Sequence, residues 1–357
     1  MTELVKIPVR DVREGGPVRQ AIDGCVPARA LRDECLTSMP SPVRTLLPAV
    51  DAITRRWLAR SASPYVADIE AIAAALGFPG IWFLNGTYEW GCTALARDQD
   101  GGPWLARTLD WPFHGLGRHL EVARMRGPAG EFFNVGWPGY AGALTALAPG
   151  RFAISVNQAP LRRRTRRPWL RPVDVVLNAL GTWRVEFCPP AHLLRQVFEN
   201  CRDFAEAKHR LETTPIARPV IFTVAGLRRG ERCVIERTEE GYSTHCDFTA
   251  AANDWLYGTE PWEARVAPNL FWKLSREEAA ARSRARRETL WSSQQGFGDD
   301  MNWLVPPVLN WFTRCAIEMC PARGILRVAG YEPARDRNLP SRVTEICELA
   351  AEPVCIR

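Results

Sequence analysis

Two antiparallel sheets covered by helices, an α+β fold, are predicted by the order of strand-like and helical segments in this chain of 357 residues. The strand-like segments come in groups, at 92–111, 120–158 and 218–248. A doubly wound parallel sheet instead needs strands that alternate singly with helices. Grouped strands between helical blocks therefore favour antiparallel sheets.

The helical blocks are recognised by apolar residues that recur at helical spacing. The pattern is clearest over 65–76, and Gly77 follows it where a C-cap glycine would end a helix. Residues 1 to about 60 are rich in proline and arginine, and the part before the helix expected at 41–60 should be extended or irregular. Further helices are expected at about 41–60, 82–89 and 191–211, with a basic loop before the last of them.

A hairpin is predicted where Asp100-Gly101, a strong two-residue turn signal, separates the strand-like runs 92–96 and 103–111. If the turn is centred on this pair, Cys92 lies opposite Leu109 on the paired strand.

The same register decides which side chains share a face with Cys92. Arg107 is its diagonal neighbour on that face and can reach the thiol. Asp110 points to the other face, so a role for it near Cys92 needs a bulge or a bend at the strand end.

Composition and charge restrict the classes of protein to which this chain can belong. The chain is 46% apolar and 24% charged, so it can bury a substantial core as one large domain or two ordinary ones. A net charge of +6, with acidic residues among the basic ones, gives little support to nucleic-acid binding. The first twenty residues contain no apolar signal segment, and no run approaches 18 apolar residues. We therefore expect a soluble, cytoplasmic protein without a membrane span.

Eleven cysteines are scattered along the chain, which without a secretion signal favours reduced thiols over disulfides. Metal binding would depend on Cys25 with Cys35, or on Cys315 with Cys320. Neither pair has CxxC spacing or a matching histidine cluster. No metal and no other cofactor is therefore expected, and most of the cysteines should be small buried side chains.

Cys92 differs from the other cysteines in its surroundings. It follows a glycine at the end of a helical segment, opens a strand, and has a cation and a carboxylate on the paired strand. A free α-amine has a pKa of about 8 and a thiol about 8.5, so the amine of an N-terminal cysteine can take the proton of its own thiol. Only five histidines are present, none in a recognisable Cys/His pattern, which disfavours a papain-like pair.

Three stretches of the chain, 69–111, 137–158 and 305–328, resemble the acid ceramidase and N-acylethanolamine amidase family of N-terminal-nucleophile hydrolases. The first stretch carries the most specific motif: Cys-Thr, an acidic glycine turn, then Arg-x-x-Asp and an aromatic residue. Here that motif consists of Cys92-Thr93, Asp100-Gly101, Arg107, Asp110 and Trp111.

The resemblance implies the αββα sandwich of the N-terminal-nucleophile (Ntn) hydrolases. It also implies a cysteine amidase that cleaves linear amide bonds, in an N-acyl amide or a ceramide-like lipid. Cys92 would be the nucleophile, exposed by self-cleavage of the Gly91-Cys92 bond. The cleavage would leave an N-terminal segment, 1–91, associated with a catalytic domain, 92–357.

The same resemblance assigns supporting roles to four further residues. Arg107 would favour the thiolate, and Asp110 would accept a hydrogen bond from the new α-amine. Asn253 would stabilise the oxyanion of the tetrahedral intermediate, although a turn asparagine explains it equally well. Arg286 is chosen from the arginine-rich run 282–287, a pattern that on a helix more often forms a solvated face.

The chain departs from the family pattern at one position. Family members that resemble acid ceramidase have an acidic residue after the asparagine that here is Asn157, whereas this chain has Gln158. A neutral amide cannot act as an acid or a base. Self-cleavage is therefore expected to be slower, differently assisted or absent.

The sequence is also compatible with functions other than amide hydrolysis. The same thioester could be passed to an amine, which would make the protein an acyltransferase. A non-catalytic protein could bind nucleic acid or an anionic surface through the basic run 162–171, with Trp169 interleaved, and a catalytically silent scaffold is a third reading. The expected substrate is a small-molecule N-acyl amide, and a transient contact with a membrane surface is expected as well. The two cleaved chains should stay associated with each other. No nucleic-acid partner is expected.

Overall fold

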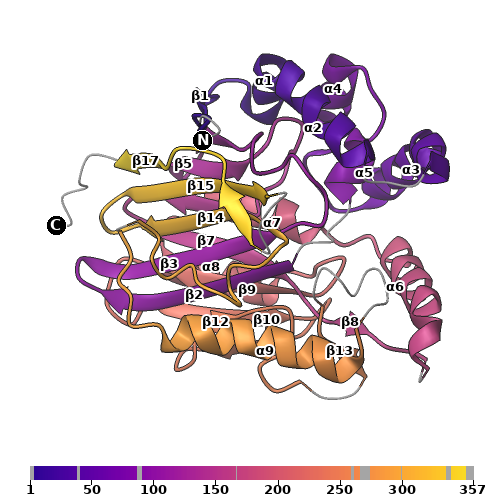
Figure 1. Ribbon diagram of the computed structural model, residues 1–357. Helices are drawn as coiled ribbons and strands as arrows, with labels where there is room; N and C mark the ends of the chain where they lie inside the picture. Colours follow the sequence, from indigo (N-terminus) through magenta and orange to yellow (C-terminus); the bar gives the residue numbers. More distant parts are fainter. Residues whose placement is uncertain are drawn as a thin grey trace.

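Two β-sheets form the centre of the molecule, and helices lie against them (Figure 1). The computed structural model describes residues 4–37, 41–86, 91–165, 167–258, 261–265, 274–298, 300–334 and 339–350. None of the helices within these ranges is long and apolar enough to cross a membrane.

The hairpin predicted around Asp100-Gly101 is present and lies within a seven-stranded sheet. Its register places Cys92 opposite Leu109, as predicted. Gly101 has a φ of 86°, in the left-handed region that glycine adopts without strain. The strand order is β12 (Ala250–Ala251), β2 (Gly91–Gln99), β3 (Gly102–Asp110), β14 (Thr313–Cys320), β15 (Ile325–Pro333) and β16 (Pro340–Arg342), and β17 (Cys347–Ala350) also pairs with β15.

The second sheet has eight strands in the described part of the chain and is antiparallel except where its edge strand β1 (Val9–Asp11) runs parallel to β4 (Glu121–Gly127). The strand groups predicted at 120–158 and 218–248 are confirmed in this sheet. After β4 its order is β5 (Gly130–Gly136), β6 (Thr145–Ala148), β7 (Phe152–Gln158), β9 (Val220–Ala225), β10 (Arg232–Arg237) and β11 (Tyr242–His245). A short separate pair joins β8 (Leu161–Arg162) to β13 (Trp262–Glu263).

The two sheets face each other across the main apolar core. Leu105 and Leu109, on one face of β3, belong to the same buried cluster as Phe132 and Val156 of the eight-stranded sheet. Trp104 belongs to a second cluster on the opposite face. Successive side chains of a strand point to opposite faces, so β3 contributes to both clusters.

Helices cover the outer face of each sheet. α7 (Pro190–Asn200) and α8 (Phe204–Thr213) pack against the eight-stranded sheet. α9 (Arg276–Ser292) lies along β2 and β12 of the other sheet (Figure 1). Helix, sheet, sheet and helix form the αββα sandwich that the sequence predicted.

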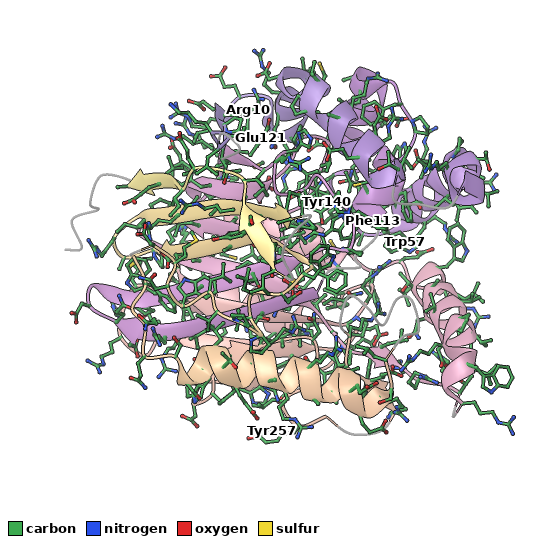
Figure 2. The ribbon with its side chains drawn as sticks, viewed as in Figure 1. Arg10, Trp57, Phe113, Glu121, Tyr140 and Tyr257 are labelled. Atoms are coloured by element: carbon green, nitrogen blue, oxygen red, sulfur yellow. The ribbon has the colours of Figure 1, made fainter. Side chains whose placement is uncertain are left out.

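The N-terminal part of the chain is mostly helical, and its helices lie at the upper right of Figure 1. These helices supply most residues of a buried apolar cluster that also includes Ala141 and Ala217. Gly77 has a φ of 65° and ends α4, as predicted. The Arg10 guanidinium lies 2.7 Å from the Glu121 carboxylate, which ties this part to β4 (Figure 2). Its helices are α1 (Gly16–Asp23), α2 (Cys25–Thr37), α3 (Ser41–Arg60), α4 (Val66–Leu76) and α5 (Ile81–Gly86).

Three expectations about helices need correction. Residues 1–40 were expected to be irregular, but α1 begins with a proline in its first turn, where the missing N–H has no helical partner to lose. The single helix expected at 191–211 is two helices, because Asp203 caps α8 by accepting from the Glu206 N–H at 2.9 Å. The basic loop contains α6 (Arg171–Arg184). The end of the helix expected at 82–89 lies outside the described residues.

Candidate active site

Cys92 is the second residue of β2 and is 1% exposed. Its side chain belongs to the cluster between the two sheets. Ten of the eleven cysteines lie in the described residues, and all ten are free. In the same residues no group of three or more His, Cys, Asp or Glu side chains is arranged to hold a metal ion.

Arg107 holds the thiol of Cys92 from the paired strand. Its Nη2 lies 2.7 Å from Sγ, and its Nη1 donates to Thr145 Oγ1 at 2.5 Å. Thr145 is on β6 of the opposite sheet, so the fully buried guanidinium is fixed between both sheets. Arg107 and Cys92 therefore lie on the same face of the hairpin, as its register predicted.

The pKa of Cys92 is raised above its ordinary value, and burial is the largest cause. The positive charges of Arg107 and Arg286 lower this pKa, whereas the negative charge of Asp110 raises it. Burial outweighs the two cations in the uncut chain. The thiol is therefore protonated at neutral pH and needs a base before it can act as a nucleophile.

Asn253 lies at the backbone of Cys92. Its Oδ1 accepts from the Cys92 N–H at 2.9 Å and from Arg286 Nη2 at 2.9 Å. Its Nδ2 donates to the Gln158 carbonyl at 2.8 Å. The side-chain amide thus joins the start of β2 to the end of β7, and in the uncut chain the nitrogen of Cys92 faces Asn253.

Arg286 reaches the same point from α9. Its Nη1 lies 3.2 Å from the Cys92 carbonyl oxygen and 2.9 Å from Asp110 Oδ2. Arg286 is 4% exposed, whereas Arg282 and Arg284 of the same run are exposed. Helical spacing turns only some of the arginines in 282–287 toward the sheet, and Arg286 is among them.

Asp110 lies on the face of β3 opposite to Arg107, as the register predicted. Besides Arg286, its carboxylate accepts from Asn310 Nδ2 at 2.9 Å and Thr313 Oγ1 at 3.0 Å. A bulge was expected at this strand end, and the structure has one in the neighbouring strand β14, where the register shifts between Thr313 and Cys315. Asp110 is therefore linked to Cys92 through Arg286.

Several contributing residues were not predicted from the sequence. Thr145, Asn310 and Thr313 lie within the stretches 137–158 and 305–328, so the family resemblance pointed to their segments without singling them out. Ser283 accepts from the Asn253 N–H at 2.9 Å and donates to Asp254 at 2.7 Å. It lies one helical turn before Arg286, a spacing that would have placed it on the same face.

A pocket of about 210 Å³ opens at Cys92. Buried apolar side chains form the part near the thiol, and Gln158 also lines the pocket. The apolar lining residues include Leu109, Leu144, Val156, Leu161 and Val220.

Three of the five described arginines in the basic run 162–171 are paired with carboxylates, which disfavours the nucleic-acid alternative. Arg163 lies 2.5 Å from Asp174 and also contacts Glu263. Arg171 lies 2.5 Å from Glu263, and both arginines are buried. Trp169 is 67% exposed. Arg166 lies outside the described residues.

An αββα sandwich with a cysteine at the start of a strand, held by an arginine on the next strand, is the arrangement expected of Ntn hydrolases. Sequence comparison finds proteins that are similar to this chain. The chain is 27% identical over 186 residues to N-acylethanolamine-hydrolyzing acid amidase of Oryctolagus cuniculus, covering 50% of this chain and 49% of that protein. It is 34% identical over 229 residues to acid ceramidase of Mus musculus, covering 57% and 56%. The resemblance seen in the sequence is confirmed.

The chain spans about half the length of these relatives. No family model matches it. Among solved structures it is similar to an N-acylethanolamine-hydrolyzing acid amidase ortholog of Caenorhabditis elegans, with a TM-score of 0.47, 18% identity, and coverage of 64% of this chain and 92% of that one. A conjugated bile acid hydrolase from Clostridium perfringens gives a TM-score of 0.40 at 11% identity, with coverage of 73% and 97%.

Proposed function

We propose that this protein hydrolyses the amide bond of N-acyl amides through a thioester on Cys92, after self-cleavage between Gly91 and Cys92. The observation that carries the proposal is the convergence on Cys92 of Arg107 at its sulfur and Asn253 at its nitrogen. The names of the relatives, which describe amide hydrolases, support the same reaction class.

Self-cleavage would begin with attack of Cys92 Sγ on the carbonyl carbon of Gly91. The carbon–nitrogen bond breaks, and the nitrogen takes a proton to become an α-amine. Water then hydrolyses the thioester, which leaves a carboxyl group on Gly91 and a free thiol on Cys92. Gly91 pairs with Asp110, and a Cβ at Gly91 would lie 3.1 Å from the Asp110 Cβ, so a glycine suits this close approach.

In turnover the new α-amine takes the thiol proton and returns it to the leaving nitrogen of the substrate. Arg107 stabilises the thiolate, and Asn253 and Arg286 orient the amine and the backbone around it. Donors at this point also stabilise the oxyanion of each tetrahedral intermediate. Water completes hydrolysis of the acyl thioester.

The N-terminal segment is expected to stay bound after cleavage. Asp68 of α4 lies 2.9 Å from Arg195 of α7, and the Tyr65 hydroxyl donates to Glu199 at 2.5 Å. β1 adds backbone pairing to β4. These contacts do not depend on the Gly91-Cys92 bond.

Intact-mass measurement of the purified protein tests the proposal. We expect two chains whose masses sum to that of the full chain plus one water, and release of free fatty acid from an N-acyl amide. Cys92→Ala should remain uncut and inactive. The matched control is Cys233→Ala, which changes another buried free cysteine and should be processed normally. An active preparation with an uncut chain, or activity in Cys92→Ala, would contradict the proposal.

A further inference from the structure

The strand register places two free cysteines opposite each other in the eight-stranded sheet. β10 and β11 are antiparallel, and Val234 pairs with His245. One step further along the same register, Cys233 faces Cys246. Cys246 directly follows β11, and its carbonyl oxygen accepts from Arg232 Nη1 at 2.8 Å, which holds it beside β10.

Both cysteine side chains point to the face of the sheet that α8 covers. Thr244 of β11 donates its hydroxyl to Glu212 of α8. Alternate residues of a strand share a face, so Cys246 lies on the same side as Thr244. The ammonium group of Lys208, also on α8, lies close enough to interact electrostatically with the thiols of both Cys233 and Cys246.

The distance between opposed residues suits a disulfide. Cα atoms that face each other in an antiparallel pair are about 4.5–5.5 Å apart, and a disulfide needs about 4.4–6.8 Å. The backbone at Cys233 and Cys246 therefore allows a bond without rearrangement. Cys92 and Cys315 differ, because they pair with Leu109 from either side. Two strand spacings, about 9–10 Å, are too long for a disulfide.

The two thiols differ in access to solvent. Cys246 is exposed, so a dissolved oxidant can reach it, whereas Cys233 is fully buried. The pKa of Cys233 is raised to about 12, mainly by burial, and the Cys246 thiol adds to the rise while Lys208 opposes it. Cys246 is therefore the thiol that reacts first with an oxidant, and Cys233 is the thiol that then bonds to it.

We propose that Cys233 and Cys246 form a reversible disulfide when the surroundings are oxidising. The Cys246 thiolate attacks one sulfur of a small-molecule disulfide, such as glutathione disulfide, whose S–S bond breaks and releases one thiolate. The Cys233 sulfur then attacks the mixed disulfide at Cys246 and displaces the second thiolate. Two protein thiols are oxidised, one small disulfide is reduced, and the two protons pass to the released thiolates.

The disulfide would cross-link the sheet where the chain leaves it for the segment that ends at Asn253. After Cys246 the chain crosses to the other sheet, where the Thr249 carbonyl accepts from the Ala96 N–H at 3.0 Å. β12 follows, and Asn253 comes two residues after its end. A bond that closes the loop 233–246 restricts the unfolded chain, so the oxidised protein should unfold at a higher urea concentration than the reduced protein.

Intact-mass measurement of full-length Cys92→Ala tests the pair without reaction of the nucleophile. After incubation of the reduced protein with glutathione disulfide, we expect a loss of the mass of two hydrogens, which dithiothreitol restores. Proteolysis without a reductant should give one linked pair of peptides that contain Cys233 and Cys246. The urea midpoint should rise on oxidation. Cys25→Ser, at another exposed free cysteine, is the matched control and should form the same disulfide.

Two variants decide between this pair and other thiols. Adding Cys246→Ser should abolish both the mass loss and the rise in urea midpoint. Adding Cys233→Ala should instead leave one glutathione bound to Cys246. A glutathione adduct without ring closure in the protein that has both cysteines overturns the inference, as does a mass loss that persists in Cys246→Ser or an unchanged urea midpoint after complete oxidation. These outcomes do not depend on whether the protein hydrolyses amides.

Discussion

Arg286 contacts the backbone of Cys92, and Arg107 contacts its side chain. Arg286 Nη1 lies 3.2 Å from the Cys92 carbonyl oxygen, and Arg107 Nη2 lies 2.7 Å from Cys92 Sγ. Two guanidinium groups thus act on one residue from opposite faces of β2. Arg107 contacts the sulfur, whereas Arg286 contacts the backbone of Cys92 and the Asn253 side chain at its nitrogen.

The first prediction concerns Arg286. Arg286→Lys should slow both self-cleavage and amide hydrolysis by about 10- to 100-fold, because an ammonium cannot serve Cys92, Asn253 and Asp110 from one planar fork. Cleavage is followed by gel or mass spectrometry, and turnover by kcat/KM. Arg284→Gln is the matched control, since Arg284 is exposed on the same helix. Equal rates of cleavage and of amide hydrolysis in Arg286→Lys and the wild type would show that Arg286 contributes to neither reaction.

The second prediction concerns the donor group of Asn253. Asn253→Asp keeps an acceptor oxygen for the Cys92 nitrogen but loses the Nδ2 donor and adds a negative charge where the oxyanion forms. We expect kcat to fall by about 100- to 1000-fold. Asn200→Asp, at an exposed position on α7, is the control. A small change in kcat with a large change in KM would instead indicate a role in substrate binding.

The third prediction concerns Thr145, which acts through Arg107. Thr145→Val keeps the side-chain shape but leaves a buried guanidinium donor without its acceptor, at a cost of about 1–3 kcal/mol in unfolding free energy. We expect kcat/KM to fall by about tenfold, with the pH profile of kcat/KM displaced because the thiolate is held less well. Thr145→Ser restores the hydroxyl and should recover both. A loss of stability with an unchanged pH profile would make Thr145 purely structural.

The fourth prediction concerns pH and His192 of α7, whose Nδ1 lies 2.8 Å from Ser63 Oγ in the N-terminal part. Burial, with a further contribution from Arg195, lowers the pKa of His192 to about 3. The folded protein therefore keeps this histidine neutral while the unfolded chain binds a proton below about pH 6.5. Stability from this residue is present above that pH and is lost as pH falls toward 3.

Between pH 7 and 4.5 we expect the free energy of unfolding to drop by about 2–3 kcal/mol through His192. Urea unfolding of uncut Cys92→Ala at the two pH values measures the drop. His192→Gln, added to Cys92→Ala, keeps hydrogen-bonding groups but does not titrate. In this double variant the drop in unfolding free energy should be smaller by about 2–3 kcal/mol. An identical drop in both proteins would show that other groups dominate.

The hairpin could be predicted in detail because its determinants are local. Asp100-Gly101 fixes the turn, and the turn fixes which residues face each other, so the contact between Arg107 and Cys92 followed from the sequence. The helix end at Gly77 was predictable for the same reason. Helices α1, α2 and α6 were missed because proline and arginine interrupt their apolar pattern, while contacts that stabilise them come from distant segments.

The motif around Cys92 distinguished this cysteine from the other ten and indicated which residue types should surround it. Only the tertiary structure decided how they are connected: Arg286 rather than Arg282 or Arg284 reaches Cys92, Asp110 acts through Arg286, and Thr145 crosses from the opposite sheet. These contacts join positions as far as 194 residues apart. Strand register is set by neighbours along the chain, whereas the packing of a helix on a sheet depends on surfaces that exist only once both have formed.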